Sequence, residues 1–186
     1  MRKLFLALVV VGLAGVASAQ EDLTKHYSAD LVTINQEHRS TSKLYVADNK
    51  TRTEVQQGPL RVVTISRPDE KIVYILLPEQ KLFVEKPFLE EDGLLAYIAD
   101  KNAERELVGT ETVKEQTCDK YKVTMRGKVL SLWVNKNTRT PVQMASAGQK
   151  SRIEWTNVQV GPQPAELLKP PADYRKFISG VGVQPQ

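Results

Sequence analysis

The chain has 186 residues, of which 26 are Lys or Arg and 22 are Asp or Glu, so its formal net charge is +4. So small a net charge gives no argument for a nucleic-acid partner. The one cysteine, Cys118, excludes a disulfide within the chain, and stability has to come from an apolar core. We expect Cys118 to be a small buried strand residue; the alternatives are a reactive thiol or a disulfide between chains.

The N-terminus has the pattern of a secretory signal peptide. A basic start, Met1-Arg2-Lys3, precedes an apolar run from Leu4 to Val16 and the small residues Ala17-Ser18-Ala19. The run is shorter than the roughly 20 apolar residues of a transmembrane helix. We therefore expect a signal peptide over residues 1–19.

Cleavage after about Ala19 would leave a single domain over residues 20–186, with 24 basic and 22 acidic residues and a net charge of +2. Gln20 stands where a lipid-anchored protein would need a cysteine. We therefore expect an exported, soluble periplasmic protein that does not span the membrane.

Beyond Tyr27 the sequence consists of short runs rich in Val, Thr, Ile and Tyr, separated by Gly, Pro, Asn and Asp turn residues. Short connections pair neighbouring strands antiparallel, and a large twisted sheet tends to curl toward a barrel. We predict a mainly β fold of about eleven strands, over residues 27–36, 42–48, 51–57, 60–67, 71–77, 80–86, 107–115, 118–126, 129–135, 141–147 and 150–160.

The run from Ile72 to Leu77 is apolar at every position, although a strand with one solvated face would alternate. Both faces of this strand must therefore be covered. A helix on the concave face would cover one of them. For the other face the candidates are the N-terminal segment 21–26 and the C-terminal tail 162–178.

One segment interrupts the strand series. Residues 88–106 begin with acidic residues, and Asp92 is a suitable N-cap. Leu94, Leu95 and Ile98 fall on one side of a helical period. We predict a helix from about residue 93 to 104, lying across the sheet or its mouth as a lid.

The motifs that carry enzyme chemistry are absent from the sequence. His26 and His38 lack helical spacing to other metal ligands, and there is no cysteine pair, nucleophile elbow or glycine-rich phosphate loop. Acidic pairs such as Glu90-Glu91 lie in polar stretches and are expected to be solvated. We therefore expect neither an enzyme nor a bound metal or cofactor.

Five stretches form an ordered series along the chain: "SKLYVADNKTRTEV" (42–55), "VVTISRPDEKIVYILLPEQKLFVEK" (62–86), "ELVGTETVKEQTCDKYKV" (106–123), "LWVNKNTRTPVQM" (132–144) and "KPPADYRKF" (169–177). Together they resemble small exported proteins of the outer-membrane lipoprotein-sorting (LolA/LolB-like) superfamily. They follow the order of the family pattern over nearly the whole expected mature chain. Glu115-Gln116 and Ala172-Asp173 depart from positions where that pattern has glycine.

The resemblance implies an eleven-stranded, antiparallel half-open barrel with a helix-bearing loop on its concave face. In the sorting proteins such a barrel carries lipoprotein acyl chains across the periplasm in an apolar cavity. Arg52 aligns with a strand-end arginine that is linked there to closing of the cavity. Most short relatives are uncharacterised, so the resemblance implies the fold more firmly than the cargo.

These observations favour a monomeric carrier that binds and releases a lipoprotein acyl chain or another hydrophobic ligand in an apolar cavity. The alternative is an envelope-sensor or protein-interaction module with the same fold and a self-filled cavity, in contact with an envelope protein. For each large side chain taken singly, plain core packing is the favoured interpretation, and the cavity interpretation concerns the set as a whole. The residues expected to line a cavity are Tyr45, Arg52, Tyr74, Leu76, Phe83, Leu94, Leu95, Ile98, Tyr121, Met125, Trp133 and Trp155.

Overall fold

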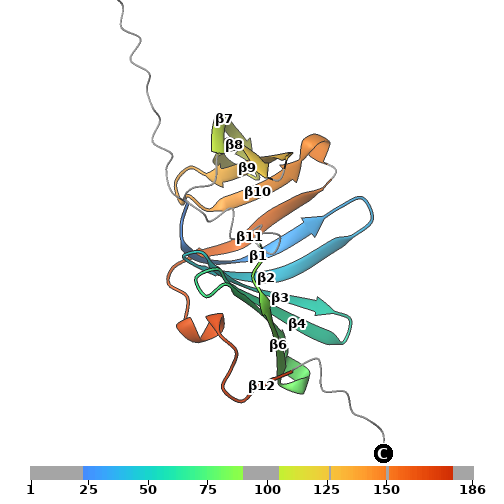
Figure 1. The fold of residues 1–186 in the computed structure, drawn as a ribbon. Coiled ribbons are helices and arrows are strands. Elements are labelled where there is room, and N and C mark those ends of the chain that lie inside the picture. The colour runs from blue at the N-terminus through green and yellow to red at the C-terminus, as the bar shows by residue number, and fades with distance from the viewer. Residues whose placement is uncertain (1–22, 90–104, 126, 150, 178–186) are drawn as a thin grey trace, which may run out of the picture.

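The computed structural model describes residues 23–89, 105–125, 127–149 and 151–177. Within these ranges the chain forms one sheet of twelve strands in the order β12-β6-β5-β4-β3-β2-β1-β11-β10-β9-β8-β7 (Figure 1). The strands are β1 (His26–Ile34), β2 (Arg39–Ala47), β3 (Lys50–Gln57), β4 (Leu60–Arg67), β5 (Ile72–Leu77), β6 (Leu82–Pro87), β7 (Arg105–Val113), β8 (Gln116–Met125), β9 (Lys128–Asn135), β10 (Pro141–Ser146), β11 (Arg152–Val160) and β12 (Arg175–Lys176). Three short 3-10 helices join them in the described ranges, η1 (Pro78–Gln80), η3 (Ala147–Gln149) and η4 (Ala165–Leu168).

All eleven strands predicted from the sequence are present, and each end lies within three residues of its predicted position. The twelfth strand, β12, was not predicted. It has two residues and pairs with β6 in parallel, whereas the other neighbours pair antiparallel. The predicted signal peptide (1–19) and the predicted helix (93–104) lie outside the described residues.

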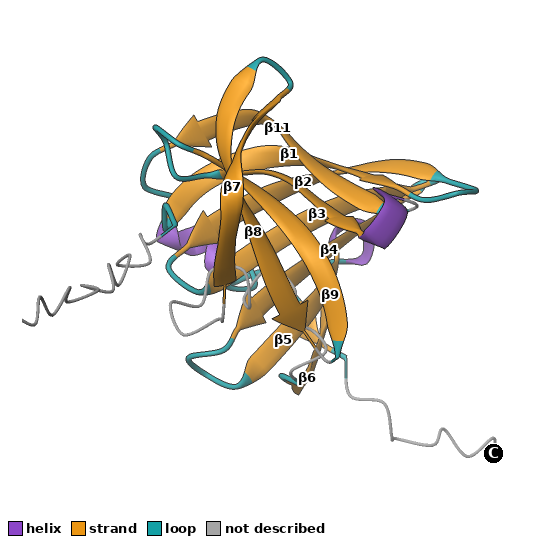
Figure 2. Ribbon diagram, turned by 90° about the horizontal axis from the view of Figure 1, so that it is seen from above, coloured by secondary structure: helices purple, strands orange, loops and turns teal. Residues whose placement is uncertain are grey.

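The sheet is open. Its edges are β7 and β12, and in the described part of the chain no pairing joins them. Seen from above, β8 and β9 run at a steep angle to β1–β4, so the sheet twists and curls along its width (Figure 2). The predicted mainly β, half-open barrel is therefore confirmed.

The main core lies on one face of the sheet, which we call the inner face. Side chains from β1, β2 and β8–β11 meet there, with Leu23 added from the segment before β1. Leu44 and Leu132 are fully buried and Trp155 is 2% exposed. A single cluster that draws on six neighbouring strands needs a sheet curved around it. We call these six strands the packed half.

The opposite face, which we call the outer face, has a smaller cluster on the packed half. Cys118, Trp133, Val142 and Ala145 pack together there, with Val113 beside them. The run Val129 to Val134 is therefore apolar on both sides because each face of β9 contributes to a cluster. Cys118 is fully buried, as expected, and burial raises the pKa of its thiol.

The C-terminal tail covers the outer face of β3–β6. We call these four strands the tail-covered half. Val63, Ile65 and Leu76 are at most 1% exposed on this face, and Tyr174 from the tail packs against them. Leu168 of η4 is buried as well. Figure 1 shows the tail running from β11 past η4 to β12 at the sheet edge.

The tail is therefore what covers the second face of the run Ile72 to Leu77. Between the two candidate covers, the N-terminal segment is excluded over its described residues, because Leu23 joins the inner cluster of the packed half and the Thr24 amide donates to the Arg139 carbonyl. Burial of one leucine-sized side chain contributes about 1.5–3 kcal/mol, so burial of Leu168 helps to hold the tail on this face.

Candidate functional site

An aliphatic surface remains partly open on the inner face of the tail-covered half. The strand register places its members side by side, since Val55 pairs with Val62, Ile75 with Val84 and Leu77 with Leu82. All six side chains are half-buried. We call this surface the open aliphatic face, defined by Val55, Val62, Ile75, Leu77, Leu82 and Val84.

The open aliphatic face differs from the neighbouring core in burial. Val73, two residues before Ile75 on the same side of β5, is 1% exposed, while Ile75 and Leu77 keep part of their surface accessible. Apolar surface of this kind attracts an apolar partner with about 25 cal/mol for each Å² removed from water. The face can therefore bind a hydrophobic group without any charged anchor.

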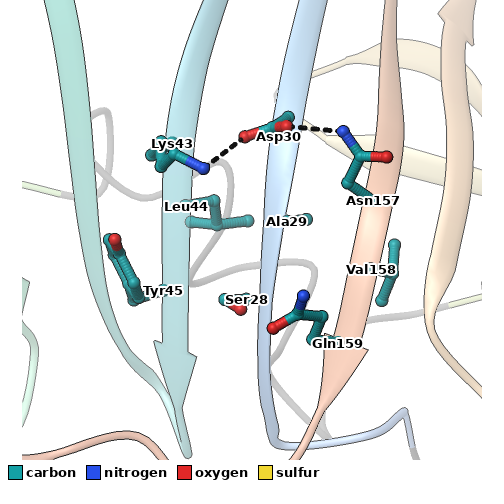
Figure 3. Close-up of a pocket in the computed structure, with 9 residues that line it drawn as sticks. All are labelled: Ser28, Ala29, Asp30, Lys43, Leu44, Tyr45, Asn157, Val158 and Gln159. Atoms are coloured by element: carbon teal, nitrogen blue, oxygen red, sulfur yellow. Dashed lines mark hydrogen bonds and ion pairs between the residues drawn. The ribbon is translucent and has the colours of Figure 1, made fainter.

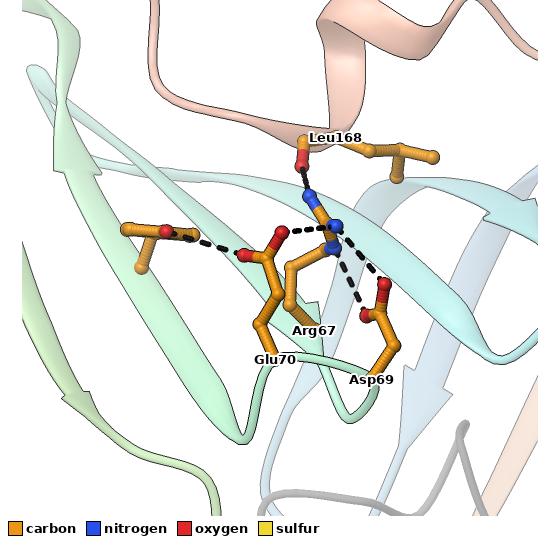
Figure 4. A network of polar contacts seen from close by, with 5 residues as sticks. Arg67, Asp69, Glu70 and Leu168 are labelled. Atoms are coloured by element: carbon orange, nitrogen blue, oxygen red, sulfur yellow. Dashed lines mark hydrogen bonds and ion pairs between the residues drawn. The ribbon is translucent and has the colours of Figure 1, made fainter.

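Two arginines attach the tail to the outer face of the same strands. Arg67 Nη1 donates to the Leu168 carbonyl at 3.1 Å, and Arg52 Nη1 donates to the Leu167 carbonyl at 3.1 Å. Arg67 is held in turn by Asp69, at 3.0 Å, and by Glu70 (Figure 4). The Arg67 guanidinium lowers the pKa of the Asp69 carboxyl.

The end of the tail is fixed by backbone bonds and ion pairs at the sheet edge. The Arg175 amide donates to the Lys81 carbonyl at 2.9 Å and the Phe177 amide to the Phe83 carbonyl at 2.7 Å. Lys81 also pairs with Asp173 at 2.8 Å. Closure of the outer face thus leaves the inner face as the accessible apolar side of β4–β6 in the described chain.

A polar groove crosses the outer face of the packed half, over β2, β1 and β11 (Figure 3). Its volume is about 450 Å³. Ala29, Leu44 and Val158 contribute flanking atoms. The polar residues that line it, which define the outer groove, are Ser28, Asp30, Lys43, Tyr45, Asn157 and Gln159.

A β-bulge shapes the outer groove. Ser28 pairs with Gln159 and Asp30 with Thr156, so two residues of β11 stand opposite Ala29. The first of these, Asn157, adopts a left-handed φ of 51°. The extra residue turns Asn157 toward Asp30, which lies on the outer face.

Asp30 is the electrostatic centre of the groove. Its carboxylate accepts a hydrogen bond from Asn157 Nδ2 at 2.7 Å and pairs with Lys43 Nζ at 3.1 Å. The Asn157 bond and then the Lys43 contacts lower the pKa of Asp30, so the carboxyl is ionised at neutral pH. The groove therefore contains an anion that its own lysine already balances.

The structure distributes the predicted cavity residues over both faces. Tyr121 and Trp155 lie on the inner face, inside the main core. Six further members lie on the outer face, because they pair in register with one another or with outer-face neighbours: Tyr45, Arg52, Tyr74, Leu76, Phe83 and Trp133. The predicted residues are thus not brought together around one cavity.

Each outer-face member has its own surroundings. Tyr74 and Phe83 pack edge to face, with ring centroids 5.9 Å apart, beneath the tail, while Trp133 donates to Glu111 at 2.9 Å. Arg52 contacts the tail and Glu54 rather than the open aliphatic face. Met125 ends β8, and Leu94, Leu95 and Ile98 lie outside the described residues.

The residues that sequence reasoning missed are those placed by register. Val62, Ile75 and Val84 lie in apolar stretches that the sequence shows, but their shared face depends on the pairing of β4, β5 and β6. The pairing of Asp30 with Asn157 joins positions 127 residues apart across a bulge, and no local pattern marks it.

Over the described residues there is no cluster of three or more His, Cys, Asp or Glu side chains suited to hold a metal ion. On the surface, His26 Nε2 lies 3.4 Å from Asp48 Oδ1. The same part of the chain contains no helix with the length and apolarity to cross a membrane.

The chain belongs to the family described as "Domain of unknown function (DUF4412)", whose model matches residues 28–140. The match begins in β1 and ends at the residue before β10, and so includes β2–β6 with the open aliphatic face. No curated protein sequence matches the chain.

Several solved structures are similar to the chain at low sequence identity. An uncharacterized conserved protein from Thermus thermophilus is 17% identical, with a TM-score of 0.60 over 83% of this chain and 91% of its own. A chain of the Pseudomonas aeruginosa MucA/MucB complex is 16% identical, with a TM-score of 0.46 over 81% of this chain and 57% of its own. LprF from Mycobacterium bovis is 12% identical, with a TM-score of 0.39 over 81% of this chain and 90% of its own. The Thermus structure establishes that the fold is a known one.

Proposed function

We propose that the protein is a periplasmic binding protein that holds an aliphatic ligand, such as a lipoprotein acyl chain, against the open aliphatic face. The observation that carries the proposal is the set of six half-buried aliphatic side chains on adjacent strands. Their outer side is already occupied by the tail. A ligand would therefore complete the burial of strands that are apolar on both sides.

The energetics favour a chain-like apolar ligand. Each methylene removed from water contributes about 0.8 kcal/mol, so a chain of about ten buried methylenes would gain about 8 kcal/mol before the cost of ordering it. Val62, Ile75 and Val84 are branched and stiff, which suits them to an unbranched chain lying across the strands. A ligand held only by such contacts exchanges by binding and release, without catalysis.

The sequence pattern supports the same function. The leader-like residues 1–19 would direct the protein to the periplasm, and the ordered motifs resemble the lipoprotein-sorting superfamily. Membership of that superfamily is part of the proposal. In the sequence, the predicted helix at 93–104 follows β6, the strand that carries Leu82 and Val84, and it lies outside the described residues.

The test is native mass spectrometry, with lipid extraction, of the mature protein purified from the periplasm of its own host. We expect a co-purifying acyl lipid or lipopeptide in stoichiometric amount. The variant Leu77→Asp should lose it, because a carboxylate on the open aliphatic face would be desolvated by the ligand. The matched control is Leu107→Asp on β7, where the leucine is 51% exposed. A clean apo mass, unchanged by added lipid, would refute the proposal.

A second candidate, a protein-interaction module, is favoured by the packed half. Leu44, Leu132 and Val134 are fully buried there, so the inner face of six strands is filled by the protein's own side chains. In this case the open aliphatic face would receive an apolar segment of an envelope protein. The second candidate would be favoured if the wild-type protein carried no lipid and captured such a protein. The variant Leu77→Asp should then fail to capture it.

A further inference from the structure

The outer groove has the features of a binding site that the proposed acyl-chain function does not use. The outer groove lies on the outer face, whereas the open aliphatic face lies on the inner one. Ala29 of β1 and Leu44 of β2, next to the groove, are buried. Its volume of about 450 Å³ falls within the range of small-molecule sites.

The charge of the groove argues against an ionic ligand. Asp30 and Lys43 are the charged residues that line it, and they form an ion pair at 3.1 Å. An anion would have to compete with the Asp30 carboxylate for Lys43, and a cation with Lys43 and Asn157 for Asp30. A neutral polar ligand faces neither cost.

The uncommitted hydrogen-bonding groups suit a ligand with several hydroxyls. In the described part of the chain, the side chains of Ser28, Tyr45 and Gln159 have no hydrogen-bond partner. Hydroxyl and amide groups both donate and accept, and the Asp30 carboxylate, with its two contacts, retains lone pairs for further donors. A sugar ring presents adjacent hydroxyls that donate and accept in the same way.

Tyr45 supplies an apolar side to the groove. Ser28 pairs with Tyr45 across β1 and β2, and Figure 3 shows the ring at the β2 side of the groove, with Ser28 and Gln159 on the other side. The ring is half-buried, so part of its surface is available for contact. An aromatic face with a polar rim matches the apolar C–H face and polar edge of a pyranose.

From this geometry we infer that the outer groove binds a neutral carbohydrate, with Tyr45 against the ring and with Asp30, Asn157, Gln159 and Ser28 hydrogen-bonded to its hydroxyls. A site this open, with exposed Asn157 and Gln159, binds weakly, with a Kd of about 1 mM.

The experiment is an NMR titration of the full mature protein with methyl β-D-glucopyranoside, methyl α-D-mannopyranoside and N-acetylglucosamine. We expect saturable amide shifts for at least one sugar, confined to β1, β2 and β11 around Ser28, Asp30 and Gln159. Asp30→Asn, which preserves shape and removes the anionic acceptor, should weaken binding about tenfold. Tyr45→Leu should weaken it by a similar factor while keeping the apolar volume.

The control for the carboxylate is Asp48→Asn, in the turn after β2, where the side chain is 57% exposed. This variant should bind as tightly as wild type. Absence of saturable shifts with all three sugars would overturn the inference, as would equal affinity in Asp30→Asn and wild type. The variant Leu77→Asp leaves the groove intact, so the amide shifts that sugar causes should persist in it. Failure of the acyl-chain proposal can therefore be distinguished from failure of this inference.

Discussion

The packed half and the tail-covered half close the two faces of one sheet in opposite ways. In the packed half, side chains of β1, β2 and β8–β11 fill the inner face. In the tail-covered half, residues from the C-terminal segment close the outer face, and the inner face keeps six half-buried aliphatic side chains. The difference identifies the apolar face that the chain's own side chains leave incompletely covered, and the proposed ligand binds there.

The largest expected effect comes from truncating matched leucines in the two halves. Leu132→Ala, at a fully buried site, should lower the free energy of unfolding by about 2–5 kcal/mol, because it leaves a cavity. Leu77→Ala, at a half-buried site, should cost about 1 kcal/mol. Denaturant unfolding of both variants measures the difference. Equal losses would mean that the open aliphatic face is ordinary core.

The next effect concerns the tail. Arg67→Ala removes a charged donor from the Leu168 carbonyl and should lower the free energy of unfolding by about 1–2 kcal/mol. Amide exchange at Arg175 and Phe177 should accelerate, since the tail opens more often. Arg61→Ala on the same strand, 46% exposed, is the control. Unchanged exchange in Arg67→Ala would show that the bond from Arg67 to the Leu168 carbonyl is not needed to hold the tail.

Acid should weaken the outer face of the packed half. Burial alone would raise the pKa of Glu154, but Lys114 and Arg152 together lower it below its usual value. A carboxyl with a depressed folded pKa stabilises the protein above its unfolded pKa of about 4.3, and this contribution is lost as pH falls through the folded value.

We therefore expect the free energy of unfolding to fall more steeply below about pH 4 in wild type than in Glu154→Gln. At neutral pH the variant should be less stable by about 1 kcal/mol, since Lys114 and Arg152 lose their partner. Parallel pH profiles of the two proteins would contradict the assignment to Glu154.

The smallest effect is expected at the rim of the packed half, on β8. Lys122 is 48% exposed and pairs with a Glu106 that is 70% exposed, so Lys122→Ala should change stability by under about 0.5 kcal/mol. Lys120 lies 5.0 Å from the Trp133 ring centroid and pairs with Glu111 at 2.8 Å. Lys120→Ala should cost about 0.5–1 kcal/mol. Identical melting curves for the two variants would remove the distinction.

The sequence was sufficient to predict the strands of both halves, because alternation, β-branched runs and turn residues are local signals. The two-faced run Ile72 to Leu77 also predicted a second cover correctly. Two short features were not predicted from the sequence, β12 and the bulge at Asn157. Each depends on pairing between segments that are distant in the chain.

The predicted cavity set failed to converge on one face for a related reason. Alternation shows which residues of one strand share a face, so Tyr74 and Leu76 were correctly grouped. It does not show which face of one strand joins which face of the next. Register supplies that information, and it places Tyr74 on the outer face and Trp155 on the inner face.

The most direct test of the proposed function is paramagnetic relaxation by a spin-labelled fatty acid added to the mature, delipidated protein. Methyl signals of Val62, Ile75, Leu77 and Val84 should broaden and recover when the label is reduced. Methyls of Leu44 and Leu132, buried in the packed half, should broaden far less. Uniform broadening, or broadening centred on the tail-covered outer face, would contradict the account.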